Sequence, residues 1–156
     1  MPTPATDRFL ERAAALGVEV QPRRFPDGTR TAADAAAAVG CDVAQIVKSL
    51  VFVADGRPVL VLTSGANRVD EAKLAAAIGA TEVRKATADE VRAATGYAIG
   101  GTPPFGHDTP LEVLCDAHLL DHEVVWAAAG TPMDVFDLTP ATLLRASGAV
   151  RADVAV

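Results

Sequence analysis

The stretch that decides the fold is IVKSLVFVADGRPVLVLTS, residues 46–64. Two apolar, β-branched runs stand on either side of Asp55-Gly56, a dipeptide that favours the tight turn of a β-hairpin. Both runs carry so few polar residues that they are typical of strands buried on both faces. The stretch therefore predicts an antiparallel pair of strands inside the protein.

Helices around the hairpin are predicted from N-capping residues and glycine stops. Thr31, Thr87 and Thr139 precede helical patterns as N-caps, and Pro140 lies in a first turn, where a missing amide N–H costs nothing. The predicted helices cover residues 7–17 behind Thr6, 31–40, a segment that ends at Gly79, 88–96 and 139–148, with one further turn at 42–45.

Strand-like segments alternate with these helices. They are VEVQP (18–22), TEVRKA (81–86), LEVLCD (111–116), VVWAAA (124–129), MDVFDL (133–138) and AVRADVAV (149–156), the last at a sheet edge. The alternation favours a sheet with helices packed against it, whereas the hairpin requires antiparallel pairing. We therefore expect an α+β fold in which residues 1–156 form a single domain, with one curved mixed sheet and helices packed outside.

Composition excludes several classes of function. The 14 basic and 20 acidic residues give a net charge of -6, which opposes binding to long stretches of nucleic-acid backbone, so we expect no DNA partner. No apolar run reaches the roughly eighteen residues that a membrane span needs, and no secretion leader is evident. The sequence thus predicts a cytoplasmic protein without membrane contact.

Neither the cysteines nor the histidines form a pattern typical of a metal site. Cys41 and Cys115 belong to no Cys-x-x-Cys pair, and His118 and His122 lack a third ligand at a recognisable spacing. We therefore predict no metal and no cofactor. There is also no Gly-x-Ser-x-Gly motif, so a hydrolase of this sequence would act without a protein nucleophile.

Lys48 stands out because it lies in an otherwise apolar strand. It is either a snorkelling lysine at the start of the strand, with its amine in water, or a functional cation. The loop AIGGTPPFGH, residues 98–107, is the second unusual feature. Gly100 and Gly101 allow a ligand to approach main-chain amides that can stabilise a developing oxyanion, while the alternative is a wide turn without a ligand. His107, in the same loop, is a further candidate.

Another candidate segment is LTSGANRVDEAKL, residues 62–74, where a strand passes into a helix. Small-molecule sites often lie at such junctions, and Ser64 and Asn67 are placed to contribute. For Asp70, N-capping of the helix is favoured over contact with a ligand.

Four stretches in this order and spacing resemble the YbaK family, the free-standing relatives of the editing insertion domain of bacterial prolyl-tRNA synthetase. They are QIVKSLVF, LTSGANRVDEAKL, GYAIGGTPPFGH and VVWAAAGTPMDVFDLTPATLL, and the match runs from about Thr31 to Gly148. The resemblance implies an aminoacyl-tRNA deacylase that acts in trans-editing. It hydrolyses the ester between a small wrong amino acid and the 3′-terminal adenosine of a tRNA, with tRNA(Pro) as the expected carrier. Alanine, cysteine, serine and threonine stay open as the amino acid.

The resemblance also implies which residues act. Lys48 holds the 3′ end, and Gly100 and Gly101 stabilise the oxyanion. The implied substrate-binding residues are Ser49, Ser64, Gly65, Asn67, Thr102, Pro103, Pro104, Ala129, Gly130 and Thr131. Prolyl-tRNA synthetase or an elongation factor is the expected protein partner. The alternative is a non-catalytic module on the same fold that binds an aminoacyl-adenosine-like ligand or docks on a synthetase.

Overall fold

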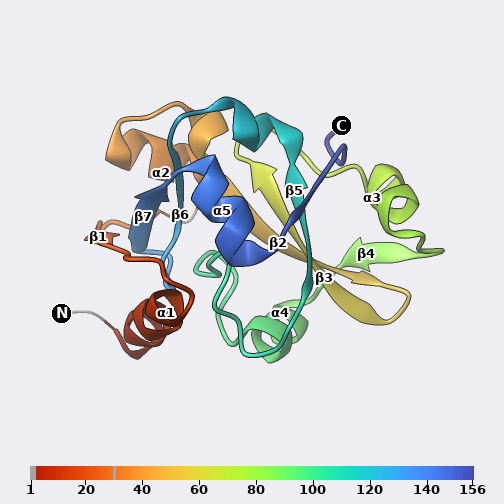
Figure 1. Cartoon of the computed structure of the whole chain (residues 1–156), viewed down its shortest axis with the longest axis horizontal. Helices are drawn as coiled ribbons and strands as arrows, with labels where there is room; N and C mark the ends of the chain where they lie inside the picture. The colour runs from red at the N-terminus through yellow and green to blue at the C-terminus, as the bar shows by residue number, and fades with distance from the viewer. Residues whose placement is uncertain (1–2, 30) are drawn as a thin grey trace.

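The computed structural model describes residues 3–29 and 31–156 (Figure 1). The helices are α1 Pro4–Ala15, α2 Ala32–Val39, α3 Glu71–Ile78, α4 Ala88–Thr95 and α5 Pro140–Ser147, with 3₁₀ turns η1 Val43–Gln45 and η2 Ala117–Asp121. The strands are β1 Arg23–Arg24, β2 Val47–Ala54, β3 Arg57–Ser64, β4 Val83–Lys85, β5 Glu112–Asp116, β6 Val125–Ala128, β7 Asp134–Leu138 and β8 Val150–Ala152. Within this described part, no helix has the length and apolar character needed to cross a membrane.

The predicted hairpin is confirmed and forms the centre of the larger sheet. β2 pairs antiparallel with β3 along its whole length, and the two-residue turn has positive φ at both Asp55 (49°) and Gly56 (83°). The strand order is β4-β2-β3-β5-β8, with β2 antiparallel to both neighbours and β5 parallel to both of its neighbours. The C-terminal segment therefore does return to the sheet edge, as β8.

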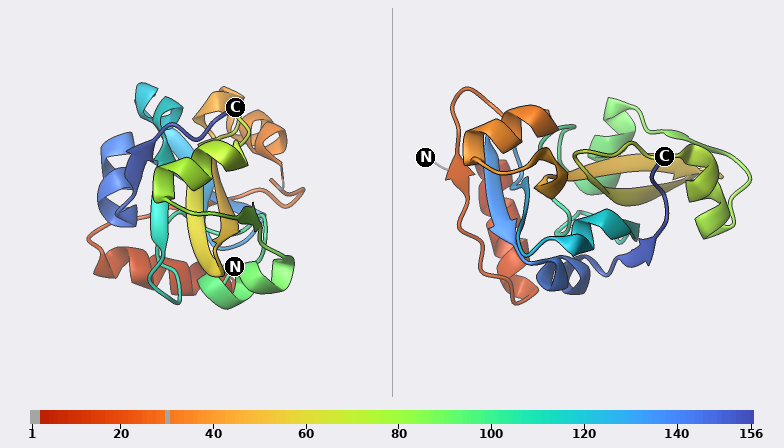
Figure 2. Two further views of the ribbon diagram at one scale, coloured as in Figure 1. Left: turned by 90° about the vertical axis from the view of Figure 1, so that its right-hand side faces the viewer. Right: turned by 90° about the horizontal axis from the view of Figure 1, so that it is seen from above.

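The α+β class is confirmed, but the expected single sheet is in fact two. β1, β7 and β6 form a separate antiparallel sheet in the order β1-β7-β6, and in Figure 2 its strands run across the direction of β2 and β3. A single bridge between Ile46 and Trp126 connects the two sheets. Ile46 stands between the turn η1 and β2, so the bridge forms just before the larger sheet begins.

Two local predictions are wrong at the N-terminal end. The segment 18–22 is not a strand: Val18 donates its amide N–H to Ala13 at the end of α1, and the paired residues of β1 come only at 23–24. Helix α1 begins at Pro4 rather than after Thr6, because Thr3 is the N-cap and accepts a hydrogen bond from the Thr6 amide. The proline in the first turn repeats the arrangement of α5.

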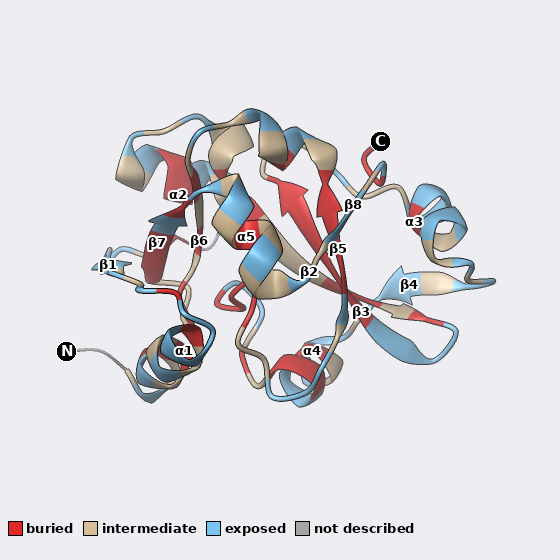
Figure 3. Ribbon diagram, viewed as in Figure 1, coloured by how far each residue is buried: buried red, intermediate tan, exposed pale blue. Residues whose placement is uncertain are grey.

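The central strands β3 and β5 of the five-stranded sheet are largely buried, as their apolar sequences predict, whereas the edge strands β4 and β8 are mostly exposed (Figure 3). On one face, side chains from β2, β3 and β5 pack with α1, α4, α5 and the smaller sheet. Three phenylalanines meet there, with ring centroids 5.4 Å apart for Phe9 and Phe105 and 5.2 Å apart for Phe9 and Phe136. Since Phe105 belongs to the glycine-proline loop, this cluster anchors that loop to the core. The opposite face packs against Leu74 of α3.

The start of α4 holds a carboxylate whose contacts lower its pKa. Glu90 accepts hydrogen bonds from the Arg84 guanidinium at 2.8 and 2.9 Å and from the Thr87 amide at 2.9 Å, and these contacts lower its pKa to about 2. A depressed carboxyl pKa stabilises the folded state fully above the ordinary value of 4.5, and the contribution is lost as the pH falls toward 2.

We therefore expect Glu90→Gln to lower the free energy of unfolding at pH 7, and the difference from the wild type to vanish as the pH approaches 2. Denaturant unfolding across this pH range measures the difference. Glu123→Gln, at an exposed position between η2 and β6, is the control and should show no such trend. A difference that stays constant with pH would contradict the assignment.

Candidate active site

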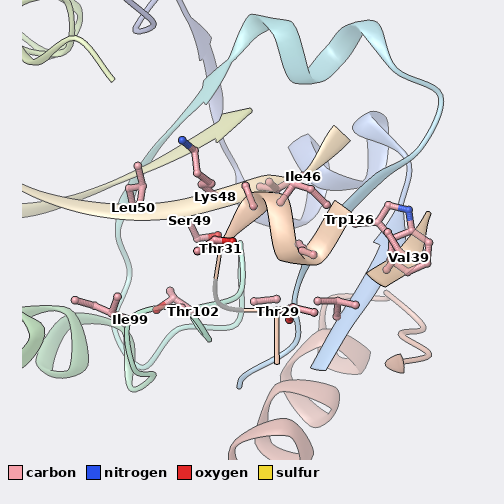
Figure 4. Close-up of a pocket in the computed structure, with 17 residues that line it drawn as sticks. Thr29, Thr31, Val39, Ile46, Lys48, Ser49, Leu50, Ile99, Thr102 and Trp126 are labelled. Atoms are coloured by element: carbon pink, nitrogen blue, oxygen red, sulfur yellow. The ribbon is translucent and has the colours of Figure 1, made fainter. Parts of the chain in front are cut away.

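A cleft of about 380 Å³ opens between the beginning of β2 and the loop that follows α4 (Figure 4). One wall is residues 46–50 of β2, and the facing wall carries Ile99, Gly100 and Thr102. The other lining residues come from α2, from the residues just before it and from the smaller sheet: Thr29, Thr31, Ala32, Ala35, Val39, Trp126, Ala127, Ala128 and Val135. The cleft therefore lies where the two sheets diverge.

Lys48 and Ser49 both line this cleft, but their side chains leave β2 on opposite sides. In Figure 4 Ser49 is directed to the side of Thr31 and Thr102, and the Lys48 amine points the other way. Successive side chains of a strand alternate in this manner. The two predicted residues are therefore neighbours in the chain that serve different surfaces.

The Lys48 amine is half-buried and donates a hydrogen bond to the main-chain carbonyl of Asn67 at 2.5 Å. Burial lowers the pKa of Lys48, and the negative charge of Asp116 opposes that effect in part. Lys85 and Arg68 lower it further by like-charge repulsion. An ammonium group has three N–H donors, so this contact leaves donor capacity for an anionic group.

Asp116 organises the polar residues beside Lys48. Its carboxylate is buried and accepts hydrogen bonds from the Ser64 amide at 3.1 Å and from the Asn67 side-chain amide at 2.8 Å. The Asn67 side chain also contacts the ring of His118 at 2.7 Å. Asn67 therefore lies beside Lys48 and supplies the carbonyl that the lysine contacts, whereas the Ser64 hydroxyl donates to the Ala44 carbonyl at 2.7 Å.

The loop wall offers main-chain donors, although not both of those that were expected. The Gly101 amide N–H donates to the Ala98 carbonyl at 3.0 Å, and the Thr102 hydroxyl donates to the same oxygen at 3.0 Å. The amides of Gly100 and Thr102 donate to no group among the described residues. Gly100 and Thr102 both line the cleft, and the amide N–H of each is without a hydrogen-bond partner in this part of the structure.

Gly101 instead permits a close contact between chain segments. A Cβ at this position would lie 2.7 Å from Thr131 Cα and 2.9 Å from the Thr131 carbonyl carbon. Behind it, a Cβ on Gly130 would lie 2.9 Å from the carbonyl oxygen of Ala5 in α1. Three backbone segments therefore stack directly, and we refer to Gly101, Gly130 and Ala5 as the backbone stack.

Most of the other predicted residues surround the cleft without lining it. Pro103 and Pro104 are buried beneath the loop, and the Pro103 carbonyl accepts a hydrogen bond from His107 Nε2 at 2.7 Å, so this histidine braces the loop. Burial lowers the pKa of His107. Gly65, Ala129, Gly130 and Thr131 pack against neighbouring backbone or core and also lie outside the lining. Asp70 caps α3 as predicted, accepting from two amides of its first turn.

Sequence reasoning missed the floor and the far wall of the cleft. Thr31 was identified only as a helix cap, which it is, yet it also faces the cavity. Trp126 is the single tryptophan of the chain, a signal that could have marked it. Ala127 and Ala128 of β6 line the cleft, whereas the predicted residues 129–131, which follow this strand, do not. Apart from the single tryptophan, nothing in the sequence separates these residues from ordinary core positions.

The chemistry available in the cleft is limited to hydroxyls, main-chain groups and one ammonium. Among the described residues, no cysteine, histidine or carboxylate lines it, and Lys48 is its only ionisable lining residue. Nor do the described residues include any cluster of three or more His, Cys, Asp or Glu that could hold a metal ion. Such a site is suited to reactions that depend on positioning and on hydrogen bonds to a developing charge.

Comparison with known proteins identifies relatives across the whole chain. A family model described as the aminoacyl-tRNA editing domain matches residues 26–146. A crystal structure described as a candidate trans-editing enzyme for prolyl-tRNA synthetase superposes with a TM-score of 0.95 at 44% identity, covering 100% of this chain and 99% of that one.

Two curated proteins are similar over shorter stretches. YwhH of Bacillus subtilis (strain 168), which is uncharacterised, is 32% identical over 120 residues, or 76% of each chain. The proline–tRNA ligase of Nitratidesulfovibrio vulgaris (strain DP4) is 33% identical over 107 residues, which are 69% of this chain. The chain thus spans only 18% of the length of that ligase.

Proposed function

Because the chain belongs to the aminoacyl-tRNA editing domain family, we propose that it hydrolyses the ester between a wrong amino acid and the 3′-terminal adenosine of a tRNA. The observation that carries this proposal is that Gly100 and Thr102, two residues that line a cleft of mostly small and apolar side chains, have amides without a hydrogen-bond partner among the described residues. Likeness to a candidate trans-editing enzyme supports action on a tRNA released by its synthetase. Likeness to proline–tRNA ligases supports tRNA(Pro) as the carrier.

In the proposed reaction the ester carbonyl lies against the loop wall of the cleft. A water oxygen bonds to the carbonyl carbon, the bond from that carbon to the ribose oxygen breaks, and the ribose oxygen takes the proton. The amides of Gly100 and Thr102 stabilise the oxyanion that forms between these steps, a contribution worth about 10²- to 10³-fold per donor. Since no carboxylate or histidine among the described residues lines the cleft, a substrate group assists the proton transfer.

Lys48 holds the 3′ end in this proposal. Its ammonium lies on the side of β2 away from Thr102, with two N–H donors left over from the contact with Asn67, and a ribose or phosphate oxygen of the 3′ end accepts them there. The net charge of -6 predicts few phosphate contacts and weak binding to tRNA alone. Prolyl-tRNA synthetase or an elongation factor then supplies further affinity, in the cytoplasm where tRNAs are charged.

The test is hydrolysis of tRNA(Pro) charged in turn with alanine, cysteine, serine, threonine and proline. We expect release of one small amino acid well above the uncatalysed rate, and no release of proline. Each rate is compared with that of the same ester without protein. If the purified protein releases no amino acid from this panel or from other mischarged tRNAs, the proposal fails and the non-catalytic binding module takes its place.

A further inference from the structure

Hydrogen bonds fix which main-chain groups of β2 face the cleft. The Ile46 carbonyl accepts from the Gly65 amide at 2.7 Å, on the side of β3. The Val51 carbonyl accepts from the Ala86 amide at 3.1 Å, on the opposite edge. Main-chain groups of successive strand residues alternate between the two edges, so the odd-numbered residues of β2 face away from β3. Ser49 therefore directs its N–H and its C=O toward the cleft.

This part of the strand edge is open. β4 pairs with β2 only from Phe52 to Ala54, and the bridge to β6 involves only Ile46. Between these points no described strand pairs with β2 on the cleft side. The Val47 carbonyl, two residues before Ser49, faces the same way. Open strand edges leave unpaired acceptors and donors that another chain or a ligand can use.

The two walls of the cleft are complementary in hydrogen bonding. The loop wall holds the amides of Gly100 and Thr102, which have no partner among the described residues, and the strand wall holds the carbonyls of Val47 and Ser49, whose direction follows from the alternation along β2. An aminoacyl ester combines an acceptor, the carbonyl oxygen, with a charged donor, the α-ammonium, on adjacent carbon atoms. A carbonyl directed at the loop amides thus leaves the ammonium facing the strand.

We infer that the open edge of β2 binds the α-ammonium of the substrate through the carbonyls of Val47 and Ser49, so that a free primary α-amine is required. This inference rests on the proposed function. The Ser49 hydroxyl supports it, because this group is buried and has no hydrogen-bond partner among the described residues. Buried polar atoms are usually paired, and the bound amine supplies the missing partner after a turn about χ1.

The requirement for a primary α-amine also explains why the ester of the correct amino acid, proline, is not hydrolysed. A primary ammonium has three N–H donors, whereas the secondary ammonium of proline has two, and a ring carbon replaces the third. That carbon would meet a strand acceptor and leave it buried and unpaired, which costs more than a lost contact. Selection against proline then depends on the amine as well as on side-chain size.

The experiment compares three esters of one tRNA that differ only at the α-substituent. For alanine these are alanyl-, N-methylalanyl- and lactyl-tRNA(Pro), and each rate is divided by its own uncatalysed rate. We expect kcat/KM to fall about 10- to 100-fold for the N-methyl and lactyl esters. Values within about twofold of one another would overturn the inference and leave the proposed function intact. If no ester is hydrolysed, the alanyl ester included, both fail.

A matched pair of variants separates the amine contact from packing. Ser49→Ala should lower kcat/KM for the alanyl ester about tenfold and leave the lactyl ester unchanged. Thr63→Val is the control: its hydroxyl is also buried without a described partner, but Thr63 pairs with Lys48 and shares its side of the sheet, away from Thr102. Thr63→Val should change neither ester. An equal loss on both esters in Ser49→Ala would overturn the role of this hydroxyl.

Discussion

Gly101→Ala is expected to reduce deacylation at least about hundredfold, although Gly101 offers no free amide to the substrate. Its new Cβ would lie 2.7 Å from Thr131 Cα, and a backbone atom of a packed segment cannot turn aside as a side chain can. The loop must therefore shift away, and the amides of Gly100 and Thr102 move with it. A displacement of 1 Å at a catalytic group can cost about 10²-fold in rate.

The matched control is Gly148→Ala at the end of α5. A Cβ there meets nothing within 4 Å, and the cost comes only from the positive φ of 68°. We expect it to lower the free energy of unfolding by about 1 kcal/mol without changing kcat/KM. Thermal unfolding and steady-state kinetics of both variants separate the effects. Wild-type kinetics for folded Gly101→Ala would show that the backbone stack does not set the geometry of the site.

Lys48→Met is the second substitution with a large expected effect, about hundredfold in kcat/KM. Methionine keeps most of the apolar stem but removes the charge, so a bound ribose or phosphate oxygen loses a charged donor. The residual rate should no longer depend on the ionisation of this residue. In the wild type, burial lowers the pKa of Lys48 below the ordinary lysine value of 10.5. The lysine-dependent part of the rate is therefore lost as the pH rises, with a midpoint below 10.5.

Lys73→Met provides the control for loss of a lysine. The Lys73 amine donates to the Ala155 carbonyl at 2.8 Å and lies 3.2 Å from an Asp153 carboxylate oxygen, far along the chain from the cleft. The Lys73→Met variant should therefore show the same kcat/KM as the wild type. If Lys48→Met also keeps full activity, Lys48 is a snorkelling residue that packs at the start of β2 and nothing more.

Much of the fold follows from local signals, which explains why it could be predicted. The Asp55-Gly56 turn, the threonine caps and the glycine stops each act over a few residues. The division into two sheets could not be predicted, because it depends on where Ile46 meets Trp126 across the fold. The strand expected at 18–22 failed for a related reason, since an apolar alternation forms a strand only where a neighbour is available.

The site shows the same division between local and tertiary information. Motif resemblance identified Lys48, Ser49, Gly100 and Thr102, all of which line the cleft. The resemblance could not show which of Lys48 and Ser49 directs its side chain toward the loop. Tertiary packing decides on which side of β2 the loop lies. The resemblance also assigned an oxyanion role to Gly101, whose amide N–H is already paired with Ala98.

The backbone stack has a consequence for transplanting this activity into another protein. The family match covers residues 26–146, whereas Ala5, which closes the stack behind Gly130, belongs to α1 and lies outside it. Arg12 of the same helix also donates to the Gly106 carbonyl at 3.1 Å. A graft limited to the matched residues would carry the loop without its foundation. A host scaffold must therefore bring its own helix to that place, or the donor segment must begin with α1.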